Sequence, residues 1–232
     1  MYHLGDRYDF VGVDHKPLTR ESFTPGNEVL ADHAMKHYSN GGNYHVVDLS
    51  ERAAVESLFK EVGELDAVVH LAGVSRRDAP FDELQKSNLE APINVFEVAA
   101  QYECIRKIIF GSSNGVYGQY EMDAEMKGKP LYDDLDFPPI TEGTSVRPEG
   151  NYSIFKVSAE LAGGCLTASH DHLSFVSLRI GAMRPNDDPE QCDATAIAGV
   201  SDPIKRFERI WLFHEDFASL VDLSLGEDFG ED

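Results

Sequence analysis

The stretch Arg106-Lys-Ile-Ile-Phe-Gly-Ser-Ser-Asn-Gly-Val-Tyr-Gly118 decides the fold class of this chain. Its apolar centre predicts a short strand over residues 106–110, and Gly111-Ser112-Ser113 ends that strand in a polar turn. A continuous apolar strand is typical of a parallel sheet that is covered on both faces. In open parallel sheets, ligands bind beyond the carboxyl ends of the strands. The turn that follows Phe110 is therefore the first place to look for a site.

The same strand pattern recurs along the chain and alternates with helical patterns. Further strands are predicted over residues 9–14, 43–48, 65–70 and 173–180, and helices over residues 51–62, 81–102 and 151–167. Ser50 is the expected N-cap of the first of these helices. Residues 120–150 and 185–203 are expected to be irregular, and 204–225 to be amphipathic. Strands that alternate with helices predict an α/β protein with a doubly wound parallel sheet of the Rossmann type.

The composition restricts the partners of the chain. Its 232 residues contain 41 acidic and 20 basic side chains, which gives a net charge of −21. Such a surface repels nucleic acids and anionic membranes, so neither is an expected partner. The acid excess favours a halophilic protein, although an ordinary acidic protein remains an alternative. Three cysteines, Cys104, Cys165 and Cys192, do not form a disulfide framework, and no secretory signal or long apolar run occurs, so a cytoplasmic location is expected.

Two motifs could carry chemistry together. Tyr152 and Lys156 are four residues apart, and a predicted helix places them on one face. An ammonium close to a phenol lowers the pKa of the phenol, which makes Tyr152 a usable general acid or base. A serine hydroxyl opposite it, from Ser113, can hold a substrate oxygen. Tyr-x-x-x-Lys matches arise often by chance, so this reading depends on the strand that ends in Ser-Ser before the helix.

Other candidates lie at strand ends. Asp14 could accept both hydroxyls of an adenosine ribose and repel a 2′-phosphate, which favours NAD over NADP, but it could equally be a turn residue. Asp48 and Leu49 end the next strand, where an adenine edge could sit. Gly73 permits close approach of a ligand to the backbone. Arg76, Arg77 and Arg184 could bind a substrate carboxylate or phosphate, and surface ion pairing is an equal alternative.

A metal site is not expected. His170 and His172 lack a carboxylate or cysteine partner at ligand spacing, and His214-Glu215-Asp216 is typical of an exposed turn. The acidic run of residues 133–136 lacks the spaced ligands and terminal glutamate of a calcium loop.

Taken in order, these motifs resemble the extended short-chain dehydrogenases, which include the NAD-dependent epimerases and dehydratases. The resemblance rests on Val69-His-Leu-Ala-Gly73, Asn88, Phe110-Gly-Ser-Ser113, Tyr117-Gly118, Tyr152 to Lys156 and Leu178-Arg-Ile-Gly181. Ser75, the Ser-Ser-Asn sequence and the tail of residues 211–217 are most similar to uronate dehydrogenases and related sugar C1 dehydrogenases.

The resemblance implies a role for each matching residue. Ser113, Tyr152 and Lys156 would be catalytic, and Asn88 would brace the active-site region. NAD would be bound by Asp14, Asp48, Leu49, Leu71, Ala72, Gly73, Ser112, Tyr152, Lys156 and Ile180. A sugar substrate would contact Ser75, Ser113, Asn114 and Arg184. A homodimer would form through the helices predicted over residues 81–102 and 151–167.

The chain departs from the family at its start. The family opens with a strand, a G-x-x-G-x-x-G loop and a helix, whereas residues 1–9 resemble only the last turn of such a helix and a linker. A start site upstream of Met1 and a truncated remnant would each explain this. We therefore expect an incomplete NAD-binding domain over residues 1–181 and a partial substrate lobe over 182–232. Gly163-Gly164 within a predicted helix is consistent with relaxed selection or with a loose helix end.

The resulting expectation is an NAD-dependent sugar or sugar-acid oxidoreductase that transfers a hydride at a Ser-Tyr-Lys site. One alternative is a nucleotide-sugar 4-epimerase or dehydratase, although Asn114 stands where dehydratases commonly carry an acid. The other is a truncated, non-catalytic protein of the same fold.

Overall fold

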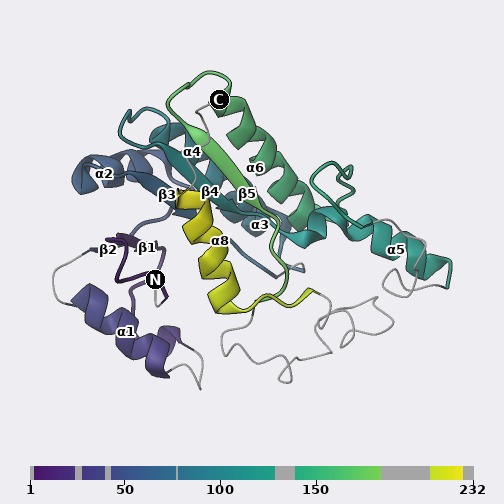
Figure 1. Ribbon diagram of the computed structural model, residues 1–232, viewed down its shortest axis with the longest axis horizontal. Coiled ribbons are helices and arrows are strands. Elements are labelled where there is room, and N and C mark those ends of the chain that lie inside the picture. Colours follow the sequence, from purple (N-terminus) through teal and green to yellow (C-terminus); the bar gives the residue numbers. More distant parts are fainter. Residues whose placement is uncertain are drawn as a thin grey trace.

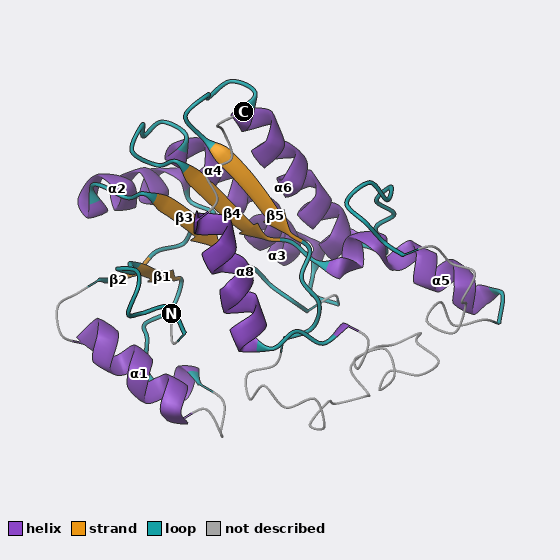
Figure 2. Ribbon diagram, in the orientation of Figure 1, coloured by secondary structure: helices purple, strands orange, loops and turns teal. Residues whose placement is uncertain are grey.

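A computed structural model describes residues 3–23, 28–39, 43–76, 78–128, 139–183 and 210–226. Two groups of parallel strands form its centre, and Figure 2 shows them lying apart. The smaller group pairs β1 (Gly12–Asp14) with β2 (Tyr44–Val46). The larger group has the order β3 (Ala67–His70), β4 (Lys107–Gly111), β5 (Ser174–Leu178). The predicted α/β class with parallel strands is confirmed.

Seven α-helices are seen in the described ranges. They are α1 (Glu28–Ser39), α2 (Arg52–Val62), α3 (Phe81–Gln85), α4 (Ala91–Ala99), α5 (Gly118–Met126), α6 (Asn151–Thr167) and α8 (His214–Gly226). A π-helical stretch, Lys86–Glu90, joins α3 to α4, and short 3₁₀ turns occur at Arg20–Ser22 and Asn114–Tyr117. No helix in these ranges is long and apolar enough to cross a membrane.

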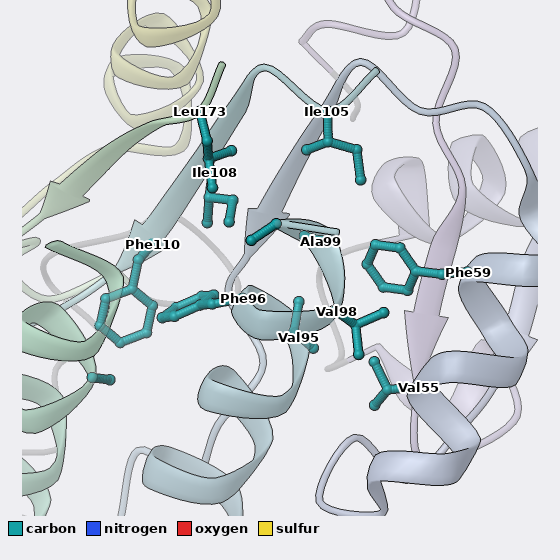
Figure 3. Close-up of a cluster of buried hydrophobic side chains, with 12 residues drawn as sticks. Val55, Phe59, Val95, Phe96, Val98, Ala99, Ile105, Ile108, Phe110 and Leu173 are labelled. Carbon is teal, nitrogen blue, oxygen red and sulfur yellow. The ribbon is translucent and has the colours of Figure 1, made fainter. Parts of the chain in front are cut away.

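The core has two layers, one on each face of β4. Ile108 and Phe110 belong to a buried cluster with side chains from α2, α4 and α6, which Figure 3 shows. Ile109 points the other way and packs with Leu4 and with Val221 of α8. This alternation is what a strand imposes on successive side chains. All five residues of β4 are buried, which explains why its sequence is continuously apolar at the centre.

The connections fix where the smaller group of strands lies. Right-handed crossovers are the rule between parallel strands, and α2, α4 and α6 all pack on the same face. The crossover from β2 through α2 to β3 therefore moves across the sheet in the same direction as the crossovers from β3 to β4 and from β4 to β5. This places β1 and β2 beyond the edge of β3 that faces away from β4. In the described ranges, β3 pairs with β4 alone.

The other face of the larger sheet is covered by α8 and by a turn near the N-terminus. Figure 1 shows α8 in yellow in front of these strands. The carbonyl of Leu4 accepts bonds from the amides of Arg7 and Tyr8, which closes one helical turn. The Tyr8 hydroxyl then donates to Asp222 of α8 over 2.7 Å. Residues 184–209 lie outside the described ranges, so the division into domains at residue 181 stays a prediction.

Several element predictions need correction. The helix predicted over residues 81–102 is helical without a break from Phe81 to Ala99, with the π-helical stretch inside it, whereas α5 occupies part of the region predicted as a loop. Glu51, not Ser50, is the N-cap of α2, and the Ser50 hydroxyl donates to Asp48 instead. The helix α1 was not predicted from the sequence. The bounds predicted for α6 are confirmed.

Candidate functional site

The site is built around the turn at the carboxyl end of β4, here called the serine turn (residues 112–117). Ser112 and Ser113 are only 1% and 7% exposed. Ser113 is the N-cap of the 3₁₀ turn, and its hydroxyl oxygen accepts the amide of Gly115 at 3.1 Å. Accepting this bond leaves the hydroxyl proton available for donation to another oxygen.

Lys156 reaches the same strand end from α6. Its side chain is buried, and Nζ donates to the carbonyl of Gly111 at 2.7 Å. The ammonium lies 4.7 Å from the centroid of the Phe110 ring and 5.9 Å from that of the Tyr152 ring. Burial lowers the pKa of Lys156 to about 8, and the negative charge of Glu160 opposes that shift. The Lys156 side chain is therefore mostly protonated near neutral pH. Its charge lies close to the ring of Tyr152.

The backbone after β3 forms the opposite wall. A Cβ atom at Gly73 would overlap the Asn88 side chain and would lie 3.7 Å from Nζ of Lys156. Asn88 is buried and holds Val74 by two bonds, accepting its amide at 3.0 Å and donating to its carbonyl at 2.9 Å. The backbone of Gly73 therefore lies beside the Lys156 ammonium, and the side-chain amide of Asn88 holds this segment in place.

His70, at the end of β3, is buried against the rings of Phe96 and Phe110. Burial, and to a smaller extent the charge of Lys156, lowers the pKa of His70 to about 3. The imidazole is therefore neutral at physiological pH and adds no charge to the site.

Glu149 is a residue of this site that sequence reasoning missed. Its oxygen Oε1 and the hydroxyl oxygens of Ser113 and Ser153 all lie within 3.3 Å of the position that a Cβ of Gly115 would occupy. A methyl group at Gly118 would overlap the Glu149 carboxylate. The only signal in the sequence is the pair of glycines that leaves room for this side chain.

The segment before Glu149 is joined to the serine turn by its backbone. The amide of Arg147 donates to the carbonyl of Val116 at 2.8 Å, and the amide of Gln119 donates to the carbonyl of Arg147 at 2.9 Å. These bonds hold the approach to α6 against the turn that carries Ser113.

The residues predicted for the adenosine end lie on the smaller group of strands. Asp14 is exposed at the end of β1, where it accepts the amide of Lys16 at 3.0 Å and lies 2.9 Å from the His15 ring nitrogen. Asp48 accepts the hydroxyl and the amide of Ser50, and these bonds lower the pKa of Asp48. Leu49 packs at the border of the main core. These contacts are compatible with both predicted roles of the two aspartates, as turn residues and as ligands of the adenosine.

The remaining predicted residues lie in two described segments or outside the described ranges. Leu71, Ala72, Gly73 and Ser75 are in the segment after β3, where Leu71 is 48% exposed. Asn114 donates its amide to the carbonyl of Ile180 at 2.8 Å, which joins the serine turn to the end of β5. Arg184 and Arg77 lie outside the described ranges. Arg76 pairs with Glu83 at 3.2 Å, in agreement with the surface ion-pair alternative.

The residues around Lys156 fit the nicotinamide end of a dinucleotide. Gly73 presents backbone without a side chain next to a buried ammonium, as a site for close approach of a ribose requires. For the pyrophosphate, the described ranges contain no G-x-x-G-x-x-G motif between a strand and a helix. They also contain no group of three metal-ligating side chains.

Known proteins resemble the chain over nearly its whole length. The model of the NAD dependent epimerase/dehydratase family matches residues 2–227. The NAD-dependent glucose-6-phosphate dehydrogenase of Haloferax volcanii is 25% identical over 98% of this chain and 75% of its own length. A uronate dehydrogenase of Pseudomonas putida is 28% identical over 77% of this chain, which spans 53% of that protein.

Solved structures support the same fold. A glucuronic acid dehydrogenase from Chromohalobacter salexigens superposes with a TM-score of 0.64 and 21% identity, over 98% of this chain and 66% of that one. The Bordetella bronchiseptica enzyme WbmG, solved in complex with NAD, gives a TM-score of 0.63 with 18% identity, over all of this chain and 65% of that one. The Rossmann-type prediction is thus confirmed, and the chain belongs to the NAD dependent epimerase/dehydratase family.

Proposed function

We propose that this chain is an NAD-dependent sugar or sugar-acid oxidoreductase that works through Ser113, Tyr152 and Lys156. One observation carries the proposal: a buried ammonium stands between a tyrosine ring, the strand end that leads to Ser113 and the bare backbone of Gly73. Family membership supports the cofactor, and the sugar dehydrogenases among the relatives support the substrate class.

Each residue of the site has a separate task. Bound NAD would supply the acceptor for a hydride from the substrate carbon. Tyr152 takes the proton of the substrate hydroxyl, helped by the adjacent charge of Lys156. The Ser113 hydroxyl donates a hydrogen bond to the same substrate oxygen and stabilises the charge that develops there. Lys156 would also hold the nicotinamide ribose, and Leu71, Ala72 and Gly73 would line the cofactor.

The substrate we favour is a sugar oxidised at its anomeric carbon. Ser75, Asn114 and Arg184 would contact it. Relatives named for glucose 6-phosphate, L-arabinose and uronate dehydrogenation support this class. The chain spans between about half and three quarters of the length of these relatives, so the substrate choice of the whole protein needs a direct assay.

The test is formation of NADH, followed by absorbance, with glucose 6-phosphate, arabinose and glucuronate. We expect Tyr152→Phe to lower kcat by about 10²–10⁴-fold, because general acid–base catalysis contributes that much. Tyr120→Phe on α5 is the matched control: its hydroxyl donates to the carbonyl of Ser145 at 3.1 Å, and the proposed reaction does not use it. Equal turnover in wild type and Tyr152→Phe would contradict the proposed role.

A second candidate is a nucleotide-sugar 4-epimerase. UDP-glucose 4-epimerase 2 of Arabidopsis thaliana is 35% identical over 33% of this chain. An epimerase returns the hydride to its substrate, so it interconverts sugars without net NADH. Chromatography of UDP-glucose after incubation separates the two functions.

A third candidate is a non-catalytic protein of the same fold that does not bind the dinucleotide, and the lack of a G-x-x-G-x-x-G motif within residues 1–232 agrees with it. Calorimetric titration with NAD, for this chain and for a version extended upstream of Met1, tests it. Binding by this chain or by the extended version rules it out, whereas binding by neither supports it.

We also propose a homodimer through α4 and α6. Leu161 and Ile154 of α6 are 66% and 45% exposed. A hollow of about 230 Å³ between the helices is lined by Ile93, Phe96, Glu97, Ala162, Cys165 and Leu166. Light scattering gives the mass in solution, and Leu161→Asp should shift it to that of a monomer.

A further inference from the structure

Arg179, which directly follows β5, makes a branched set of bonds that the proposed reaction does not use. Its Nη2 donates to Oε2 of Glu160 at 2.7 Å, and its Nε lies 3.1 and 3.2 Å from the two carboxylate oxygens. Glu160 is on α6, one turn beyond Lys156, and its side chain is only 10% exposed. A guanidinium fork on a nearly buried carboxylate is a rigid arrangement.

The pair holds the serine turn at both ends. At the start of the turn, the Ser112 hydroxyl donates to Oε1 of Glu160. At the end of the turn, Nη1 of Arg179 donates to the Tyr117 hydroxyl, and the guanidinium carbon lies 5.1 Å from the centroid of the Tyr117 ring. Ser113 lies between these two anchor points.

A third link joins the same elements through the backbone. The amide of Asn114 donates to the carbonyl of Ile180, the residue after Arg179, at 2.8 Å. The turn that carries Ser113 is thereby tied to β5 and, through Glu160, to the helix that carries Tyr152 and Lys156.

We propose that Arg179 and Glu160 are positioning residues that set the place of the Ser113 hydroxyl relative to Tyr152. This inference rests on the proposed function of Ser113 and Tyr152. A misplacement of about 1 Å in an active site can cost about 10²-fold in rate. Loss of the pair should therefore lower kcat by displacing the Ser113 hydroxyl.

The experiment compares Arg179→Lys with Arg52→Lys. Arg52 offers a matched control because it also joins two elements, bonding Glu56 of α2 at 3.1 Å and Glu97 of α4. Lysine keeps the charge in both variants and removes the fork. We expect Arg179→Lys to lower kcat by about 10–100-fold while the KM for the sugar and the Kd for NAD change less than about 3-fold. Arg52→Lys should leave kcat unchanged.

Two further variants test each anchor. Tyr117→Phe removes the bond at one end of the turn, and Ser112→Ala removes the bond at the other. Each should lower kcat, and adding Tyr117→Phe to Arg179→Lys should lower it by less than the product of the two separate effects. Full multiplicativity, or a kcat loss that Arg52→Lys reproduces, would overturn the proposal.

Amide hydrogen exchange gives a readout without turnover. The amides of Asn114 and Gly115 should exchange at least about 10-fold faster in Arg179→Lys than in Arg52→Lys, because their bonds depend on the place of the turn. Unchanged exchange overturns the inference by itself. Faster exchange in a chain that forms no NADH from any sugar overturns the proposed function and supports the positioning of the turn.

Discussion

At the scale of single residues, Lys156 shows how the site and the stability of the fold are linked. Burial lowers the pKa of its ammonium to about 8, whereas a lysine in an unfolded chain titrates near pH 10.4. Between these two pH values the unfolded chain binds more protons than the folded chain. The contribution of this residue to stability is therefore unfavourable below about pH 8 and improves as the pH rises towards about 10.5.

A comparison of wild type with Lys156→Met isolates this effect. From about pH 7 to about pH 10, the free energy of unfolding of wild type should rise relative to the variant by up to about 3 kcal/mol. Urea denaturation at a series of pH values measures the difference. Other titrating groups are common to both proteins and largely cancel. A difference that stays constant with pH would mean that Lys156 is not desolvated.

Gly118 makes a second prediction at this scale. A methyl group there would overlap the carboxylate of Glu149, so Gly118→Ala should lower the free energy of unfolding by about 1–3 kcal/mol. Gly143→Ala is the matched control, because the nearest atom to its added methyl would be 3.8 Å away. Adding Glu149→Ala to Gly118→Ala should recover much of the loss, which denaturant unfolding of the double variant checks. If stability is not recovered, the inference that Glu149 packs against Gly118 is wrong.

At the scale of elements, the sequence predicts what local patterns determine. The continuous apolar strands and the helix α6 follow from such patterns, and so does the placement of Ser113 and Lys156 at one sheet edge. The helix α1 was missed because its buried side chains include the small residues Ala31 and Ala34, which give a weak apolar period. Glu149, Glu160 and Arg179 were not assigned roles, since their contacts join segments that are distant along the chain.

Gly163 in α6 is an element-scale case where structure changes the interpretation. The sequence suggests a helix weakener under relaxed selection, yet a methyl group there would overlap the Phe175 ring of β5. Gly163→Ala should therefore destabilise the fold by about 1–3 kcal/mol, in spite of its better helix propensity. Gly164→Ala faces open space and should instead stabilise by up to about 1 kcal/mol. Thermal unfolding of the two variants tests this prediction. Equal changes in Tm would contradict the packing of Gly163 against Phe175.

At the scale of the whole molecule, charge is the dominant feature. A net charge of −21 on 232 residues produces self-repulsion that opposes the compact state. The sheet also contributes less to stability than a continuous sheet would, because its two groups of strands are not hydrogen-bonded to each other in the described ranges. Stability should thus depend strongly on the ions in solution.

Salt provides the test of this dependence. The screening length is about 10 Å at 0.1 M salt and about 3 Å at 1 M, so molar KCl removes most repulsion between separated carboxylates. We expect Tm to rise by about 4–8 °C between these concentrations, which for a chain of this size corresponds to about 2 kcal/mol. Sucrose at matched osmolality is the control, because it stabilises compact states without screening charge. If KCl raises Tm no more than sucrose does, the acidic surface does not mark adaptation to high salt, and the repulsion is already balanced within the fold.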